Sequence, residues 1–530
     1  MELSFREGNR DEFDMQLDMS IQSIGASLEG PIGSGKGSWL FSARRSYFDI
    51  LFKLVDINGP KPTYSDYQTK LVYNLSDKLK LSVLNILAVD YSYQSRDEGY
   101  DFESNTFGGL DNVNNTAGLN LQYLWNKNGF SNFSISHNYM YYKNTIAETR
   151  TAVNILDNKS TEQEIRFRNN NHFTLNESNK IEFGIDSKVL LNNYLTQYYP
   201  YTDRLGNTTP QLFINDKLRS FKAGGYLSYT WQPHNKINIL PGIRLDYFDY
   251  NKHLTISPRF IIKYNFNTLT SLSATAGIYH QNLPLVLLGQ KQQFQELKDP
   301  LAYHFILGLS HLVTENTKLT IEAYQKEYRN FPMNPAQPEL FILDQVFSDS
   351  YFSNYDVLTD NGRARSYGLE IMLQKKLADK VYGMISASYF RAKYQDLNGT
   401  WQNRIYDNRI TFSAEGGYKP NEKWEFSLRW IFAGGAPYTP FDESASAAAF
   451  KGIYDLNSIN DSRLPDYHSL NVRVDRRFLF QGSNLIFYLS IWNTYGRQNV
   501  ITYTWDEMKN KVKAEKSWST LPVFGLEYEL

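Results

Sequence analysis

The chain lacks cysteine, long apolar runs and any appreciable net charge. With no Cys among its 530 residues, disulfides, thiolate metal sites and cysteine nucleophiles are excluded. Lys and Arg total 55 against 56 for Asp and Glu, a net charge of −1, so the composition implies no polyanionic partner such as a nucleic acid. No apolar run approaches the roughly 18–20 residues that a membrane-spanning helix needs.

Aromatic residues are abundant instead. The chain contains 39 Tyr and 33 Phe, yet its mean hydropathy is only −0.49. A chain that is rich in aromatics and polar on average is apolar on alternate residues only. This combination is typical of membrane β-barrels, which carry girdles of aromatic side chains.

The stretch 465–492 shows this alternation most clearly. Polar and apolar residues alternate over 469–478, and a second alternating run covers 485–492, after a short turn that contains Gly482. Period-two patterns on both sides of such a turn predict a β-hairpin. One face carries Arg473 and Asp475 and must meet water, whereas the other face is almost entirely apolar.

The same pattern recurs along the chain and predicts about 22 strands. The connections between them alternate in length. Short turns are expected at 76–78, 126–129, 176–179, 233–235, 314–317, 378–379, 420–422 and 481–483. Most of the other connections are long, at 47–63, 96–115, 143–160, 194–217, 282–299, 332–364 and 434–464.

This alternation favours one fold class. Outer-membrane barrels have short periplasmic turns and long extracellular loops, and an open sheet edge in hydrocarbon would leave backbone groups unpaired. We therefore predict an all-β fold, a transmembrane antiparallel β-barrel over residues 11–530. Its last strand is expected to run to Leu530.

Nine short stretches, in order along the chain, resemble the barrel of TonB-dependent outer-membrane receptors, most closely those of Bacteroidetes-type bacteria. They are 28–31, 42–47, 241–246, 257–260, 277–281, 302–304 with Gly308, 366–370, 434–440 and 464–468. The resemblance implies a bacterial outer-membrane protein for the energised uptake of a scarce, bulky solute of the siderophore, cobalamin, glycan or peptide class. It implies no cofactor and no nucleic-acid partner.

The sequence departs from this family at its N-terminus, where the family carries a plug domain. We expect residues 1–10 to be a remnant of the plug-to-barrel connection, and 1–9 contain no apolar signal-peptide region. The resemblance implies a plug supplied in cis or in trans, which is reached by TonB–ExbB–ExbD. A surface lipoprotein or other subunits are further possible partners, and outer-membrane lipid surrounds the barrel.

Three alternatives stay open at this point. A structural or interaction barrel in a surface protein complex needs no transport cycle. A passive pore is expected if no plug is supplied. A soluble all-β protein is the last alternative.

Motifs for catalysis or metal binding are weak. The stretch 30–38 approaches a phosphate-binding P-loop but has Gly37 where the motif has Ser or Thr, so a Gly-rich turn is the better prediction. The acidic loop 97–103 lacks EF-hand spacing, and the eight His show no paired-ligand spacing. No nucleophile elbow accompanies a plausible triad. We therefore expect neither an enzyme nor a metal site.

Two sets of candidate functional residues follow. Ligand contacts in loops and the upper lumen are implied by the resemblance for Tyr198, Tyr199, Tyr201, His280, Gln281, Asn282, Tyr438 and Phe441. Aromatic and amide groups near a mouth can stack on and hydrogen-bond a bulky solute; alternatively, these aromatics pack on one another or join the outer girdle. The polar strand faces place inside the lumen Glu370, Arg473, Asp475, Arg477, Glu527 and Glu529.

Overall fold

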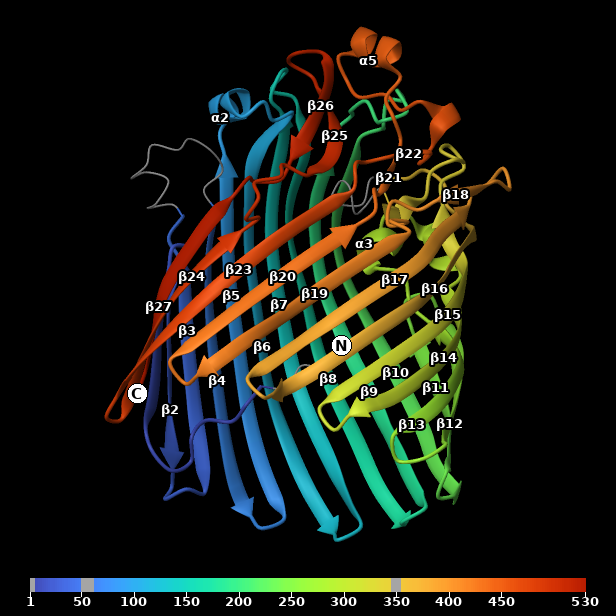
Figure 1. Cartoon of the computed structure of the whole chain (residues 1–530). Helices are drawn as coiled ribbons and strands as arrows, with labels where there is room; N and C mark the ends of the chain where they lie inside the picture. The colour runs from blue at the N-terminus through green and yellow to red at the C-terminus, as the bar shows by residue number, and fades with distance from the viewer. Residues whose placement is uncertain (1–4, 49–61, 345–353) are drawn as a thin grey trace.

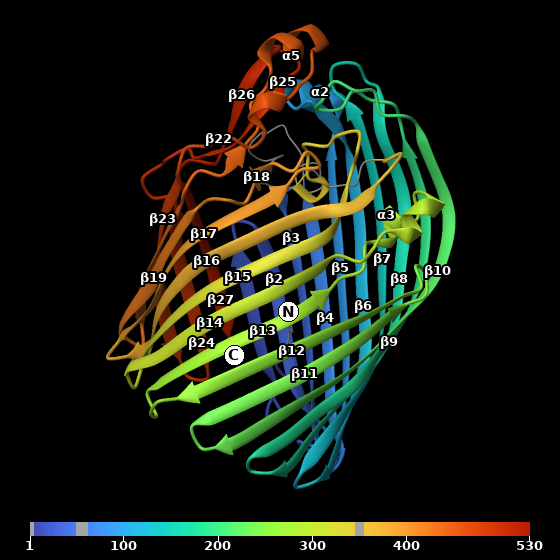
Figure 2. The same ribbon diagram turned by 90° about the vertical axis from the view of Figure 1, so that its right-hand side faces the viewer.

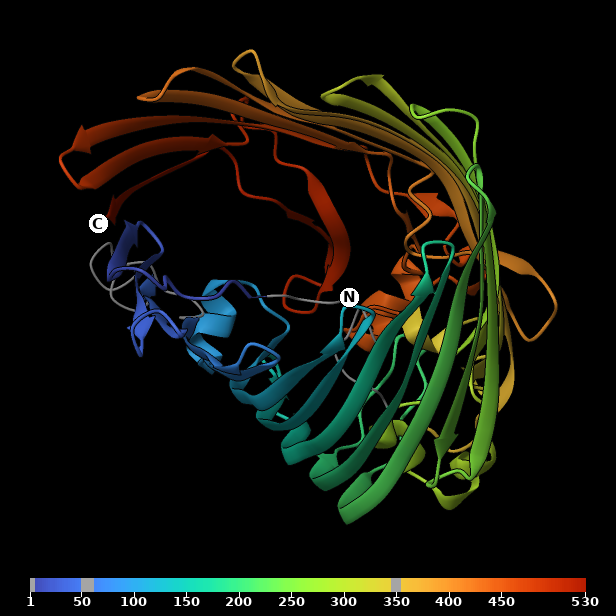
Figure 3. The same cartoon turned by 90° about the horizontal axis from the view of Figure 1, so that it is seen from below.

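The wall of the molecule is a sheet of antiparallel strands that closes on itself (Figure 1 and Figure 3). The computed structural model describes residues 5–48, 62–344 and 354–530. The predicted connection at 47–63 therefore lies almost entirely outside the described residues, as do residues 1–4 and part of the predicted loop at 332–364.

The strands of the wall follow one another in chain order. The first are β1 (Asp14–Ser20), β2 (Ser23–Ile32), β3 (Gly37–Ser46), β4 (Thr63–Ser76), β5 (Leu79–Gln94), β6 (Thr106–Asn126), β7 (Gly129–Glu148), β8 (Asn154–Asn176), β9 (Asn179–Tyr198), β10 (Leu212–His234) and β11 (Ile237–Phe248). The others are β12 (His253–Asn265), β13 (Thr270–His280), β14 (Leu301–Thr314), β15 (Thr317–Met333), β16 (Thr359–Ala378), β17 (Val381–Gln395), β18 (Trp401–Asn403), β19 (Ile410–Asn421), β20 (Trp424–Ala433), β23 (Tyr467–Phe480), β24 (Ser483–Trp492) and β27 (Leu521–Glu529).

Short elements lie in the loops above the wall. They are α2 (Arg96–Asp101), α3 (Leu285–Leu288), η1 (Gln292–Glu296), β21 (Pro437–Tyr438), α5 (Glu443–Ala449), η2 (Leu456–Ser458), β22 (Ser462–Arg463), β25 (Val500–Asp506) and β26 (Lys511–Lys516). None of the helices in the described ranges has the length and apolar character needed to cross a membrane.

The barrel closes between its first and last strands. Residues Gln16–Ser20 of β1 register with Gly525–Glu529 of β27, and the other wall strands pair with their neighbours in the chain. Strands β18 and β19 both pair with β17, one after the other along its length, and so fill a single position in the wall. The barrel therefore has 22 strand positions, which confirms the predicted fold class.

Alternation along each strand produces two faces, because successive side chains point to opposite sides of a sheet. On β16, Tyr367, Leu369 and Ile371 are about two-fifths exposed and lie on the outer face. Glu370 lies between them on the inner face. Apolar outer residues and polar inner residues are what a barrel with lipid outside and water inside requires.

The two ends of the barrel differ, but several connections at the long-loop end are shorter than predicted. The predicted loops 96–115 and 143–160 are only the connections 95–105 and 149–153, because the flanking strands extend into them, and β1 and β2 are joined by two residues. Strands β11 and β12 are joined by only four residues, 249–252, at the long-loop end. The predicted loop 194–217 is shorter than expected, because β9 and β10 continue to a pairing of Tyr198 with Leu212. Figure 2 shows the low rim over β11 and β12.

The glycine-rich stretch 30–38 is the turn between β2 and β3. Gly33 and Gly35 adopt positive φ angles of 60° and 84°, which glycine tolerates without a steric cost. The two strands pair directly on either side, with Ile32 opposite Gly37. No helix follows, so this turn has none of the structure of a phosphate-binding loop.

Candidate functional site

The long-loop end of the barrel is partly filled by one of its own loops. The connection between β13 and β14 carries α3 and η1 and packs against the inner face of β8 to β11. Within it, Leu287, Leu288 and Phe294 are completely buried. We call the resulting core the inner-mouth cluster; its buried members are Leu156, Tyr194, Tyr198, Ile214, Phe248, Leu283, Leu285, Leu287, Leu288, Phe294, Leu297, Ile342, Tyr355 and Leu358.

The first three ligand candidates divide between this cluster and the loop above it. Tyr198 is only 4% exposed and belongs to the inner-mouth cluster, so it packs against neighbours and offers no open surface. The Tyr199 hydroxyl donates to Asp157 Oδ2 at 2.8 Å, and this bond raises the pKa of the Tyr199 phenol. The Tyr201 carbonyl accepts from the Thr209 backbone N–H at 2.8 Å.

The next three candidates begin the inward-packed loop. His280 ends β13, with its Nδ1 3.1 Å from Ser257 Oγ. The Gln281 backbone N–H donates to the Pro300 carbonyl at 3.0 Å, and its side chain is exposed. Asn282 Nδ2 donates to Asp299 Oδ2 at 3.0 Å. Their role as ligand contacts stays a prediction.

Asp299 was missed by the sequence reasoning, although it joins three segments. Its side chain is 2% exposed and lies 3.3 Å from His253 Nδ1. Asn251 and Asn282 both donate to it, at 3.3 Å and 3.0 Å. No local motif marks Asp299, because its partners come from other segments of the chain and meet only in the folded mouth.

A second structure crosses the opening. The hairpin of β25 and β26, residues 500–516, which we call the strap, lies within the outline of the barrel when viewed from below (Figure 3). Trp505 is 3% exposed, its ring centroid lies 6.0 Å from that of Phe441, and the Tyr503 ring is 5.0 Å from Tyr438. The last two ligand candidates, Tyr438 and Phe441, therefore pack against aromatic residues of the strap. This is the alternative given above, in which loop aromatics pack on one another.

Polar contacts fix the tip of the strap to the connection between β5 and β6. Asn105 Nδ2 donates to the Trp505 carbonyl at 2.6 Å, and Asn105 Oδ1 accepts from the Glu507 backbone N–H at 3.1 Å. Glu103 pairs with Lys509. These residues lie some four hundred positions apart in the sequence, so only the closed barrel brings them together.

The lumen wall carries paired charges. Arg473 Nη2 lies 2.6 Å from Asp475 Oδ1, and the guanidinium stands 4.0 Å above the Tyr488 ring. Glu527 accepts from Gln16 across the closure between β27 and β1. Glu370, Arg477 and Glu529 share the same inner face of their strands, opposite the lipid-facing rows. Contact of these residues with a plug stays a prediction.

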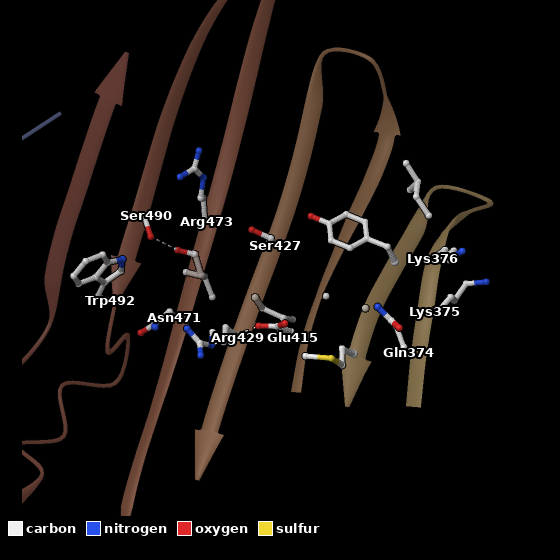
Figure 4. Close-up of a pocket in the computed structure, with 17 residues that line it drawn as sticks. Gln374, Lys375, Lys376, Glu415, Ser427, Arg429, Asn471, Arg473, Ser490 and Trp492 are labelled. Atoms are coloured by element: carbon white, nitrogen blue, oxygen red, sulfur yellow. Dashed lines mark hydrogen bonds and ion pairs between the residues drawn. The ribbon is translucent and has the colours of Figure 1, made fainter. Parts of the chain in front are cut away.

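A hollow of about 820 Å³ lies on the inner wall beside Arg473 (Figure 4). Its polar lining includes Asn471, Ser427 and Ser490, and Arg429 Nε lies 3.5 Å from Glu415 Oε2. Arg429 and Arg473 have carboxylates nearby, but the lining also contains Lys375 and Lys376, for which the described residues provide no ion pair. The hollow therefore carries net positive charge.

Residues 5–10 lie against the inner wall of the barrel. Arg6 pairs with Glu29 of β2, and Glu7 pairs with Lys80 of β5. Lys70 of β4 donates to the Phe5 carbonyl. All three wall residues lie on inner strand faces, so the chain reaches β1 from within the lumen.

The part of the chain that the structure describes contains no cluster of metal-ligating side chains. Among residues 5–48, 62–344 and 354–530, no three His, Asp or Glu side chains are grouped so as to hold a metal ion. The barrel is a tube with a polar inner wall. Its outer mouth is narrowed by the inward-packed loop between β13 and β14 and covered in part by the strap.

Comparison with known proteins identifies this architecture. Residues 55–493 match the family model described as TonB dependent receptor-like, beta-barrel. The chain belongs to this family. It is therefore a non-enzymatic outer-membrane β-barrel of the TonB-dependent receptors, and the family implies contact with TonB through a plug.

Solved structures of the same fold are distant in sequence. The ferric-catecholate import receptor Fiu from E. coli K12 matches with a TM-score of 0.70 at 10% identity, covering 99% of this chain and 82% of that one. The unliganded ferric citrate transporter FecA gives 0.68 at 15% identity, covering 98% and 79%. The copper transporter OprC gives 0.68 at 10% identity, covering 99% and 81%. No curated protein matches the sequence significantly.

Proposed function

We propose that the chain is the membrane barrel of a receptor for energised, TonB-dependent uptake of a scarce, bulky solute of the siderophore, cobalamin, glycan or peptide class. The solute binds at the loop-covered mouth, and a plug, in cis or in trans, occupies the lumen and receives the pull of TonB. The named transporters with this fold carry ferric chelates or copper, which makes metal chelates the first solutes to test.

The observation that carries this proposal is the path of residues 5–10. Ion pairs of Arg6 and Glu7 with Glu29 and Lys80 hold this segment on the inner wall. This path supports a plug that would enter the lumen from the same segment and face the polar wall. The inward-packed loop and the strap give the mouth contact surfaces that an open pore does not need.

The test compares a strain that lacks the gene with its parent, each with and without TonB. Uptake of radiolabelled ferric siderophores, cobalamin, oligosaccharides and peptides is measured at nanomolar concentrations. We expect one class to enter only when both the gene and TonB are present, and a protonophore to abolish its entry. Uptake of that class without TonB would overturn the proposal and favour a passive pore.

A planar-bilayer measurement separates the remaining alternative. If no class depends on the gene and the purified chain does not conduct, the chain acts as an interaction barrel. A stable protein partner on the long loops would then co-purify with it.

A further inference from the structure

The inward-packed loop between β13 and β14 ends at an Asp–Pro peptide bond. Asp299 and Pro300 form the only Asp–Pro pair in the sequence, although the chain contains 18 prolines. An aspartate carboxylate can close a five-membered ring on its own carbonyl carbon, and carboxylates act as nucleophiles in proteins. The proline nitrogen that would leave carries no N–H and therefore loses no backbone hydrogen bond. The dipeptide by itself indicates no function, so its setting in the fold is decisive.

The carboxylate of Asp299 is buried and held in one place. Its side chain is only 2% exposed. Asn282 Nδ2 donates to Oδ2 at 3.0 Å, Asn251 Nδ2 donates to Oδ1 at 3.3 Å, and His253 Nδ1 lies 3.3 Å from Oδ2. A nucleophile that is already fixed beside its target loses little freedom when it attacks, which lowers the entropic part of the barrier.

A further side chain reaches the carbonyl of the same residue. Asn330 Nδ2 donates to the Asp299 carbonyl oxygen at 3.3 Å. Asn330 belongs to β15 and has a φ of 60°, an uncommon conformation for a residue other than glycine. A donor on this oxygen stabilises the negative charge that develops there when the carbonyl carbon is attacked. The nucleophile and the group that it would attack are therefore both held by amide side chains.

The bond can break without opening the wall. β13 ends at His280 and β14 begins at Leu301, and these two residues are register partners. The Gln281 backbone N–H donates to the Pro300 carbonyl at 3.0 Å, so the new N-terminus would stay beside β13. No strand pairing is lost, whereas the loop that carries α3 and η1 gains a free end and can leave the mouth.

We propose that the folded protein cleaves its own Asp299–Pro300 bond. Asp299 Oδ1 attacks the Asp299 carbonyl carbon and forms a C–O bond, while the Asn330 amide stabilises the oxyanion. The C–N bond then breaks, and its electron pair goes to the proline nitrogen, which takes a proton from solvent. This step leaves a cyclic anhydride at Asp299 and a free amine at Pro300.

One water molecule opens the anhydride to two carboxyl groups. The net reaction is the hydrolysis of one peptide bond, with no oxidation or reduction. Asp299 is the nucleophile and Asn330 touches the reacting carbonyl, whereas Asn251, Asn282 and His253 are positioning residues. The reaction does not depend on whether the barrel transports a solute.

The test follows the purified full-length chain, folded in detergent, during incubation in mildly acidic buffer. After boiling, gels and intact mass spectrometry are expected to show fragments 1–299 and 300–530, whose masses sum to that of the parent plus one water. Unboiled samples are expected to keep the migration of a folded barrel. Asp299→Asn keeps the shape of the side chain but lacks the carboxylate, and is expected to abolish both fragments. Asn330→Gly tolerates the positive φ but lacks the donor, and is expected to slow cleavage about tenfold.

A matched bond is obtained with Gln232→Asp, which places a second aspartate before a proline. Pro233 is exposed at the short-turn end of β10. In the folded variant we expect the 299–300 bond to break about tenfold faster than the 232–233 bond or more, because only the former is preorganised. After unfolding in guanidinium the two rates are expected to be equal.

Three results would overturn the proposal: an intact 299–300 bond in the folded parent, equal rates at the two bonds of the folded Gln232→Asp variant, or cleavage that persists in Asp299→Asn. If Asp299→Asn does not fold, the Gln232→Asp variant decides, since its two bonds are compared within one molecule that is unchanged around Asp299.

Discussion

Adjacent residues on one strand of this protein face different media. On β23, Val472 belongs to the apolar row that contains Val474, and Asn471 belongs to the polar row of Arg473 and Asp475. A step of one residue reverses the face of a strand. Whether a side chain faces lipid or the lumen therefore follows from its odd or even position along the strand, and no knowledge of its contacts is needed.

This alternation of faces predicts how the free energy of unfolding responds to a charge at neighbouring positions. Val472→Arg is expected to lower the free energy of unfolding by about 2–4 kcal/mol, because it places a charge in hydrocarbon. Asn471→Arg places the same charge in the lumen and is expected to cost only about 1 kcal/mol, for the lost hydrogen bond from the Asn493 backbone N–H. Urea unfolding in lipid vesicles measures both. An equal cost at the two positions would contradict the assignment of the faces.

A second residue-scale prediction concerns pH. Glu507 lies in the strap, outside the membrane-spanning strands, and burial raises the pKa of its carboxyl to about 7 from about 4.5. Lys451 and Arg150 oppose this rise, whereas the charge of Glu148 adds to it. Since the docked state holds the proton more tightly, docking is strongest at low pH and weakens as the pH rises from about 4.5 through about 7.

We expect the mobility of a spin label at Val512→Cys to increase as the pH is raised from about 5 to about 8, because the strap then detaches more often. The chain contains no other cysteine, so the label is specific. Glu507→Gln is expected to remove the pH dependence, whereas Glu443→Gln, an exposed change in α5, leaves it intact. A label whose mobility does not change with pH in the parent would refute this role of Glu507.

At the scale of elements, the strap is held by contacts with distant parts of the chain. Its tip contacts Glu103 beyond α2, through Lys509 and Lys513. A short bis-maleimide linker between Glu103→Cys and Lys509→Cys is therefore expected to cross-link in high yield.

The control pair is Glu103→Cys with Lys217→Cys, since Lys217 lies on the outer wall of β10 and cannot be reached. Its yield is expected to be near zero on mass spectrometry of the linked peptides. Equal yields from the two pairs would show that the strap does not rest across the mouth.

The loops also show how far the ligand candidates were accessible to sequence reasoning. Tyr438 and Phe441 were selected because they are aromatic and lie in a long loop, and the structure packs them against the strap. Asp299, which binds three segments together, carried no signal in the sequence. Loop side chains obey no periodic pattern, so their partners follow from the fold alone.

At the scale of the whole molecule, closure depends on one short seam. Only Gln16–Ser20 of β1 registers with β27, and an unpaired edge in hydrocarbon costs several kcal/mol for each exposed backbone group. Deleting residues 525–530 is therefore expected to prevent assembly of the barrel. Deleting the six residues 443–448 in the exposed loop helix α5 is expected to leave it intact. Heat-modifiable migration and protease resistance distinguish the two outcomes; a folded 525–530 deletion would contradict closure through β27.

The sequence by itself determined the wall of this protein. Period-two alternation, alternating connection lengths and the need to pair every backbone group in lipid leave a closed antiparallel barrel as the consistent solution. Local rules suffice there because each strand meets only its neighbours and one of two media.

Only the tertiary structure decided what lies at the mouth. The inner-mouth cluster, the contact of Glu103 with Lys509 and the contact of Asn330 with Asp299 each depend on register or on segments far apart in the chain. Such contacts are set by the closed geometry of 22 strand positions. No short stretch of sequence contains that information.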